Sequence, residues 1–286
     1  MAFPSTRTQL GAPRPIGVFD SGVGGLSVLR ALRARLPSER FLYVADSGHA
    51  PYGDRTTAFV RGRAEAVAGF LARQQAKAMV IACNTASVQA AAHLRRTHAL
   101  PIVAMEPAIK PAMRATRTRV VLVLATTATI RSPSVARLCR EHGAGVRILL
   151  QPCPGLADQV ERGEFCSPAT RRLLHDYVSP GLAQGADTVV LGCTHYAFLG
   201  HEIAALAGPS VTLVEPSEAI ARQLAAVLAD APPVSAPGAG TAAFYTTGAR
   251  ADLAAFLGAI GEPAPVCTLP EEGAFSDRPP AARPRA

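Results

Sequence analysis

Two cysteines occupy matching positions in the two halves of the chain. Cys83 follows the apolar segment 79–82 and Cys193 follows the apolar segment 189–192, and small polar residues come directly after both. Short apolar runs of this kind are typical of buried parallel strands. Because ligands bind at the carboxyl ends of such strands in open α/β sheets, the pattern predicts a site with one sulfur on either face of a substrate. The inversion of a carbon centre by proton transfer needs such an arrangement.

Thiols suit the removal and return of an amino acid's α-proton without a cofactor. A thiolate takes the proton from one face, a thiol on the opposite face returns one, and the roles exchange with the handedness of the substrate. A lone cysteine on a buried strand is more often a small core residue, but two in matched contexts favour an acid/base function for Cys83 and Cys193. The other four cysteines are interpreted as structural: Cys139, Cys153, Cys166 and Cys267.

Each thiol needs a neighbour that accepts or positions its proton. His195, two residues after Cys193, points the same way as that cysteine if the strand geometry continues; a hydrogen-bonded structural histidine is the alternative. Asp20, at the end of the first expected strand, is the natural partner of Cys83, although an Asp before a glycine-rich segment also caps helices. Glu161, on the helix expected after Cys153, is a further carboxylate that could approach Cys193.

The glycine-rich turn after Asp20 resembles a dinucleotide-binding loop without being one. Ser27 breaks the G-x-G-x-x-G spacing, and the carboxylate of Asp20 would repel a pyrophosphate. The glycines instead let backbone N–H groups approach a substrate carboxylate. Further donors for a substrate are expected from Tyr52-Gly53, Asn84-Thr85 and Thr194, and Asp20 carries the charge that an ammonium group needs.

Strand-like apolar runs alternate with amphipathic segments along the chain, a pattern typical of βαβ units. Both halves place a strand with a hydroxyl-bearing turn before a strand that ends in cysteine. We therefore expect an α/β fold with two pseudo-symmetric domains, mostly parallel sheets flanked by helices, and the active site in the cleft between them. The first domain is predicted to comprise residues 15–107 plus 217–269 and the second residues 108–216. Residues 1–14 are predicted to be a flexible N-terminus and 270–286 a disordered tail.

The strands and helices are expected at definite positions. Besides the two runs before the cysteines, strands are expected at 16–19, 41–45, 101–105, 120–124, 146–151 and 242–246. Helices are expected at 25–36, 56–75, 87–97, 134–142, 156–163, 169–184, 218–228 and 249–257, with a flexible linker over 231–238.

Composition narrows the class of protein. The 286 residues are 49% hydrophobic and 17% charged, values that are typical of globular chains and exclude wholesale disorder. No apolar run approaches the roughly 20 residues that span a bilayer, and the start lacks the apolar core of a secretory signal. A cytoplasmic protein is therefore expected. No C-x-x-C pair occurs, which argues against a metal site or a redox dithiol.

The net charge of +8 comes from an excess of Lys and Arg in the first half of the chain. Pairs such as Arg61 with Arg63, and Arg95 with Arg96, are scattered along expected helix surfaces. Aromatic residues are only 5% and tryptophan is missing, which argues against a nucleic-acid partner. Solvated helix faces are the main interpretation; a polyanion-binding surface and a field that attracts an anionic substrate are the alternatives.

Around the two cysteines and the glycine-rich turn, the chain resembles glutamate racemase, the cofactor-independent enzyme that supplies D-glutamate for bacterial peptidoglycan. The matching segments are 16–27, 51–53, 82–87 and 192–196, with weaker agreement at 106–108, 125–129, Cys153-Pro154 with Glu161, and 244–248. The similarity extends from about residue 15 to about residue 269. The combined motifs are specific, whereas any one alone would be weak.

The resemblance implies roles for individual residues. Cys83 and Cys193 would be the two acid/base catalysts, assisted by Asp20, His195 and Glu161. The substrate-binding residues implied are Asp20, Ser21, Pro51, Tyr52, Gly53, Asn84, Thr85, Thr126, Thr129, Thr194 and His195. Glutamate would be the substrate, with no cofactor, no metal and no membrane partner, and a homodimer is left open. The alternatives are aspartate racemase, a one-cysteine decarboxylase of malonate-type acids, and an interaction protein that uses the basic first half.

Overall fold

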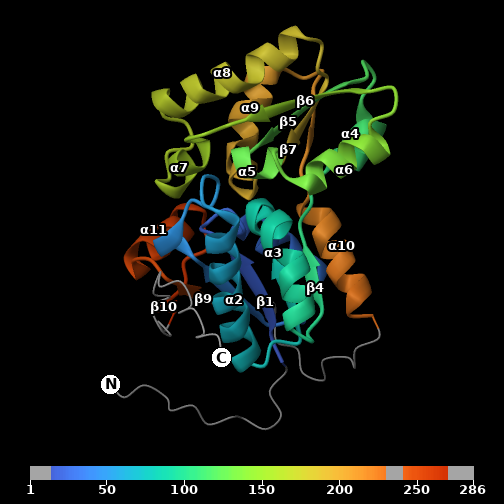
Figure 1. Cartoon of the computed structure of the whole chain (residues 1–286). Coiled ribbons are helices and arrows are strands. Elements are labelled where there is room, and N and C mark those ends of the chain that lie inside the picture. The colour runs from blue at the N-terminus through green and yellow to red at the C-terminus, as the bar shows by residue number, and fades with distance from the viewer. Residues whose placement is uncertain (1–13, 230–240, 270–286) are drawn as a thin grey trace, which may run out of the picture.

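The computed structural model describes residues 14–229 and 241–269. Residues 1–13, the expected linker at 231–238 and the expected tail at 270–286 lie outside the described residues. Two parallel sheets form an upper and a lower lobe, each with helices around its sheet (Figure 1). In the described part of the chain, no helix has both the length and the apolar composition that crossing a membrane needs.

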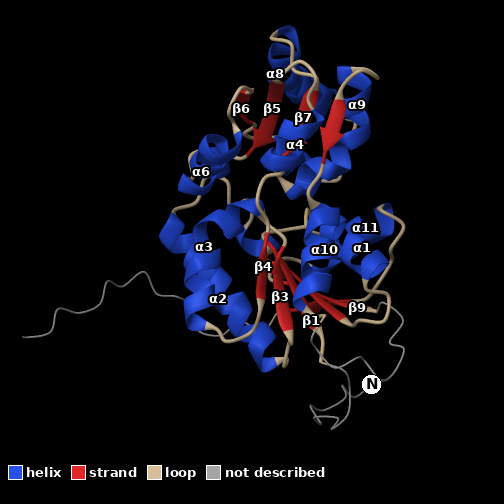
Figure 2. Ribbon diagram, turned by 90° about the vertical axis from the view of Figure 1, so that its right-hand side faces the viewer, coloured by secondary structure: helices blue, strands red, loops and turns tan. Residues whose placement is uncertain are grey.

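The lower lobe is built on six parallel strands in the order β10-β9-β2-β1-β3-β4. These strands are β1 (Ile16–Asp20), β2 (Phe41–Ala45), β3 (Ala78–Ile81), β4 (Ile102–Ala104), β9 (Ala242–Thr246) and β10 (Val266–Thr268). Its helices are α1 (Leu26–Arg35), α2 (Thr57–Arg73), α3 (Asn84–Thr97), α10 (Ser217–Val227) and α11 (Arg250–Ala259). Helices α2 and α3 cover one face, and α1, α10 and α11 the other (Figure 2). Strands β1, β2 and β3 are buried throughout, which explains their continuous apolar sequences.

The upper lobe is built on four parallel strands in the order β6-β5-β7-β8. These are β5 (Val120–Ala125), β6 (Arg147–Pro152), β7 (Thr188–Leu191) and β8 (Thr212–Val214). The helices are α4 (Ile109–Ala115), α5 (Thr127–Ile130), α6 (Pro133–His142), α7 (Leu156–Glu161), α8 (Pro168–Ala183) and α9 (Gly200–Ala207). Two 3₁₀ helices complete the described elements, η1 (Ser47–His49) in the lower lobe and η2 (Thr194–Leu199) in the upper.

The two lobes repeat one strand order. The arrangement β2-β1-β3-β4 in the lower sheet corresponds to β6-β5-β7-β8 in the upper, so β3 and β7 are equivalent strands. Strands β9 and β10 extend the lower sheet alone. The predicted α/β class with parallel sheets is confirmed; the division of the chain at residues 107 and 216 stays a prediction. The chain passes between the lobes after β4 and again after β8 (Figure 1).

Several expected elements are wrong in their bounds or were missed. The helix expected at 87–97 begins at Asn84, because the Cys83 sulfur accepts a hydrogen bond from the Ala86 N–H and caps the helix one turn earlier. Strands β8 and β10 have only three residues each, too few for a period-of-two pattern to stand out. The helices α4, α5 and α9 have four to eight residues, too few for a helical period of 3.6 residues to stand out, and they were missed.

Candidate functional site

The strand order of each lobe brings the predicted residues to one sheet edge. In the lower lobe β1 lies between β2 and β3, so the connections from the carboxyl ends of β1 and β3 leave in opposite directions. Ligands bind at such switch points in open α/β sheets. Asp20 ends β1, and Cys83 follows β3, which pairs with β1 in parallel register. The equivalent strands of the upper lobe, β5 and β7, present Thr126 and Cys193.

Cys83 is buried in its own lobe and contacts two polar groups there. Its Sγ lies 3.4 Å from the Ser21 Oγ and 3.5 Å from the Ala86 nitrogen. Burial raises the pKa of the Cys83 thiol, and the Asp20 carboxylate raises it further. The surroundings of Cys83 therefore favour the protonated thiol over the thiolate.

Asp20 uses only one of its two carboxylate oxygens within the described structure. Its Oδ2 accepts a hydrogen bond of 2.5 Å from the Gly25 N–H, at the start of α1. Its Oδ1 is buried and has no hydrogen-bond partner among the described residues. Burial raises the pKa of Asp20 to about 6, although nearby His195 acts to lower it. Asp20 thus stabilises the start of a helix, the alternative role considered for it, and still offers an oxygen to a ligand.

Cys193 lies beside a histidine–carboxylate pair. The Cys193 Sγ is 3.6 Å from the His195 Nδ1, and the His195 Nε2 is 2.6 Å from the Glu161 Oε1. Burial lowers the pKa of His195, but the contacts with Cys193 and Glu161 outweigh burial and raise it well above its usual value. Burial likewise opposes ionisation of Glu161, and its hydrogen bond with His195 lowers the Glu161 pKa overall. The raised pKa favours the protonated imidazole, and this cation lies in contact with the Cys193 sulfur.

His195 lies beside Cys193 as expected, but not because the strand continues through both residues. Strand β7 ends at Leu191, and residues Thr194–Leu199 form the 3₁₀ helix η2, so the strand does not continue to His195. The contact arises because Cys193, with extended backbone, immediately precedes the tight turn of η2. That turn brings the imidazole back to the sulfur.

The glycine turn of the lower lobe meets the catalytic candidates of the upper lobe. The Val23 N–H donates to the Glu161 Oε1 over 2.9 Å. A Cβ on Gly22 would lie 1.8 Å from that oxygen, and a Cβ on Gly24 would lie 2.5 Å from the Thr194 Oγ1. The lobes can approach this closely only because these positions carry no side chain.

Threonine hydroxyls form a second bridge between the lobes. The Thr85 Oγ1 lies 2.9 Å from the Thr126 Oγ1 and 3.3 Å from the Thr129 Oγ1, and the last two hydroxyls are 2.9 Å apart. Gly53 lies beside Thr126, since a Cβ there would be 3.3 Å from the Thr126 Cβ. Asn84 is buried next to Thr85, and neither its Oδ1 nor its Nδ2 has a partner within the described residues. Buried polar atoms of this kind call for a ligand or another partner.

The hydroxyl of Tyr52 is bound to Asp46, a carboxylate outside the predicted set. Tyr52 is buried, and its hydroxyl donates to the Asp46 Oδ2 over 2.5 Å. The segment Pro51-Tyr52-Gly53 can therefore offer a substrate its main chain, while the Tyr52 side chain holds the segment in place. Asp46 itself was not among the predicted residues, although it directly follows β2 at the same sheet edge as Asp20.

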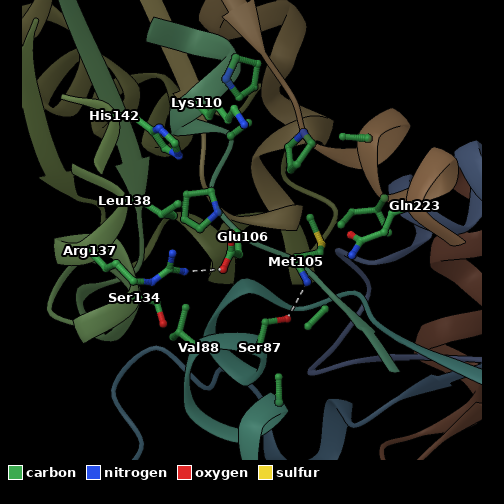
Figure 3. A pocket seen from close by; sticks show the side chains of 18 of the residues that line it. Ser87, Val88, Met105, Glu106, Lys110, Ser134, Arg137, Leu138, His142 and Gln223 are labelled. Carbon is green, nitrogen blue, oxygen red and sulfur yellow. Dashed lines mark hydrogen bonds and ion pairs between the residues drawn. The ribbon is translucent and has the colours of Figure 1, made fainter. Parts of the chain in front are cut away.

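A separate cavity of about 600 Å³ lies beside the two chain crossovers (Figure 3). It is lined by residues of α3, α4, α6 and α10, and the Arg137–Glu106 ion pair, at 3.0 Å, lies in its wall. None of the predicted site residues lines it. The candidate site is thus defined by the contacts around the two cysteines.

Comparison with known proteins agrees with this geometry. The family model for Asp/Glu/Hydantoin racemase matches residues 25–224. The chain belongs to this racemase family. The glutamate racemase of Ectopseudomonas mendocina (strain ymp) is 54% identical over 215 residues, which cover 75% of this chain and 82% of the relative. That of Ralstonia nicotianae is 48% identical over 255 residues, 89% of this chain and 92% of the relative.

Solved racemase structures share the fold. Escherichia coli glutamate racemase, in complex with L-glutamate and the activator UDP-MurNAc-ala, superimposes with a TM-score of 0.82 at 30% identity, covering 91% of this chain and 100% of that one. The resemblance to glutamate racemases that the sequence motifs indicated is confirmed, as is the isomerase class. The roles of the individual site residues stay predictions.

Proposed function

We propose that this racemase-family chain interconverts L- and D-glutamate through two cysteines, without a cofactor. The observation that carries the proposal is the equivalence of Cys83 and Cys193, which follow corresponding strands of the two lobes and have opposite electrostatic surroundings. D-Glutamate made in this way would supply peptidoglycan synthesis in the cytoplasm. Curated relatives named glutamate racemase support this substrate.

In the proposed reaction the thiolate of one cysteine forms an S–H bond with the α-proton, and the C–H electron pair stays on the α-carbon. The thiol of the other cysteine then gives its proton to the opposite face. For one enantiomer Cys193 is the base and Cys83 the acid. The opposite enantiomer needs the reverse state, in which Asp20 accepts the Cys83 proton and His195 supplies one to Cys193.

The buried polar atoms without partners support the proposed binding mode. The Asp20 Oδ1 would accept a hydrogen bond from the substrate ammonium, and the Asn84 amide can both donate and accept. Hydroxyl and main-chain groups complete the proposed set around the two substrate carboxylates: Ser21, Thr85, Thr126, Thr129, Thr194, His195 and the segment Pro51-Tyr52-Gly53, in which Tyr52 and Gly53 carry the N–H donors. His195, with Glu161, adds the positive charge that a developing carbanion favours.

Proton NMR in deuterated buffer tests the proposal. The purified protein is incubated separately with L-glutamate and D-glutamate without added cofactor, and optical rotation is followed in parallel. We expect the α-proton signal and the optical rotation to disappear together. Aspartate, one methylene shorter, serves as the matched substrate and is expected to react far more slowly. Faster reaction with aspartate would reassign the substrate, and no exchange with either amino acid would contradict the proposal.

A further inference from the structure

Asp46 is a buried carboxylate whose two oxygens are both fully occupied. Its Oδ1 lies 2.8 Å from the Arg63 Nη2, 2.8 Å from the Thr247 Oγ1 and 3.0 Å from the His49 Nδ1. Its Oδ2 accepts from the Arg63 Nε over 3.0 Å and from the Tyr52 hydroxyl over 2.5 Å. The side chain is 0% exposed. A carboxylate in this position connects α2, the end of β9 and the segment 47–53.

The segment 47–53 is fixed at both of its ends by this arrangement. At its start, the Gly48 N–H donates to the Thr247 Oγ1 over 3.1 Å, and Thr247 in turn donates to Asp46. Towards its end, the Tyr52 ring packs edge-on against Phe19 and Phe59, with centroids 6.4 Å apart in both pairs. The Tyr52 hydroxyl then reaches Asp46. These contacts hold the main chain of the segment at both ends.

The fixed segment ends at the threonine bridge between the lobes. Gly53 follows Tyr52 directly and lies against Thr126, which contacts Thr85, two residues after Cys83. A shift of Tyr52 would therefore move main chain at the place where the proposed substrate carboxylate is held. Displacements of about 1 Å at such a place are large enough to weaken binding or catalysis.

We propose that Asp46 is a positioning residue for substrate binding, which holds the Pro51-Tyr52-Gly53 main chain at the cysteine site through Tyr52 and Arg63. This inference rests on the proposed racemisation of glutamate. Asp46 acts on binding from behind the segment, so its removal raises KM and leaves proton transfer between the cysteines largely intact.

The upper lobe offers a matched control in Asp187. Its carboxylate also ties a loop, accepting from the Thr116 hydroxyl over 2.6 Å and from the Arg117 and Thr118 N–H groups over 2.8 and 3.0 Å. Asp187 precedes β7, however, and so lies at the amino end of the sheet, away from Cys193 at the carboxyl end. A purely structural carboxylate at Asp46 would behave like Asp187.

The test compares kcat, KM and Tm for Asp46→Asn, Tyr52→Phe and Asp187→Asn. Tyr52→Phe removes a single hydroxyl and is expected to raise the KM for glutamate about tenfold, with kcat within about threefold of wild type. Asp46→Asn is expected to raise KM further. Asp187→Asn is expected to lower Tm and leave KM unchanged.

The outcomes separate this inference from the proposed function. If Asp46→Asn does not fold, Tyr52→Phe still decides, because it leaves the Asp46–Arg63 ion pair in place. Variants that only lower Tm, as is expected of Asp187→Asn, or that lower kcat at unchanged KM, would overturn the positioning role. A wild-type protein that does not racemise glutamate would instead overturn the proposed function.

Discussion

The two cysteines have equivalent places in the fold and opposite chemical surroundings. Cys83 lies beside a hydroxyl and a carboxyl group, and burial together with the Asp20 carboxylate raises its pKa. Cys193 lies beside an imidazole whose other nitrogen binds a carboxylate. The lower-lobe sulfur thus lies beside a carboxylate that opposes its ionisation, whereas the upper-lobe sulfur lies beside an imidazole whose pKa is raised.

The two lobes thus repeat the same strand order, but the side chains around the two sulfurs differ. Two-base racemisation needs one thiol and one thiolate at a time, and two identical surroundings would give both sulfurs the same state. Glu161 adds a link between the lobes, because it binds His195 and also accepts the Val23 N–H of the lower lobe. Approach of the lobes and orientation of the upper base are therefore coupled.

The largest expected effect comes from removing either sulfur. Cys83→Ala and Cys193→Ala are each expected to lower kcat for glutamate by more than about 1,000-fold, since each removes a proton donor and acceptor. Cys139→Ala, on α6, is the control and is expected to keep activity within about twofold of wild type. Polarimetry with both enantiomers gives the rates. Full activity in either site variant would contradict the claim that both cysteines transfer a proton.

A smaller effect is expected from the neighbours of the sulfurs. Asp20→Asn and His195→Asn are each expected to lower kcat/KM about 100-fold. The equilibrium constant between enantiomers is unity, so this loss is the same for L- and D-glutamate. The asymmetry appears in the α-deuterium isotope effect, which we expect to rise for one enantiomer in Asp20→Asn and for the other in His195→Asn. A rise for the same enantiomer in both variants would contradict separate partners.

The pH dependence of the free energy of unfolding is expected to distinguish the carboxylates of Asp20 and Glu161. Burial raises the folded-state pKa of Asp20 from 3.8 to about 6, so its favourable contribution exists below the unfolded value and is lost as pH rises through about 6. Asp20→Asn is therefore expected to be more stable than wild type at pH 8, by about 3 kcal/mol, and nearly equal at pH 4.

Glu161 is expected to behave in the opposite way. Its folded-state pKa is lowered, so its ionised form stabilises the fold above the unfolded value, and this contribution is lost as pH falls. Glu161→Gln should therefore be less stable than wild type at pH 8. Chemical denaturation of both variants at the two pH values measures these differences. If Asp20→Asn is less stable than wild type at pH 8, burial of the ionised Asp20 carboxylate does not destabilise the folded protein, which contradicts this prediction.

The smallest expected effect concerns the threonine bridge. Thr126→Val removes one hydroxyl that contacts both Thr85 and Thr129 and keeps the shape of the side chain. A neutral hydrogen bond is worth about 1 kcal/mol, so KM for glutamate should rise about fivefold. Steady-state kinetics at saturating and limiting substrate separate this from a change in kcat. An unchanged KM would remove the bridge from the proposed binding set.

The sequence was most informative where residues act locally. The apolar runs before Cys83 and Cys193 predicted buried parallel strands. The polar residues directly after these cysteines predicted a site at the carboxyl edge of the sheets. The Asp46 arrangement was missed, because it depends on contacts such as that with Thr247, 201 residues away. The capping of α3 by the Cys83 sulfur was missed because cysteine is not a usual capping residue. Glu161 was expected near Cys193 from its place on the helix after Cys153, but its link to Val23 of the other lobe could not be foreseen from spacing.

Isotope incorporation at low conversion tests the two-base account most directly. Each enantiomer of glutamate is incubated with the wild-type protein in deuterated buffer, the reaction is stopped early, and substrate and product are separated and analysed for α-deuterium. Because separate thiols act on the two faces, we expect deuterium in the product enantiomer and hydrogen in the recovered substrate. Product that retains its hydrogen, or recovered substrate that gains deuterium as fast as product forms, would indicate a single base and contradict the account.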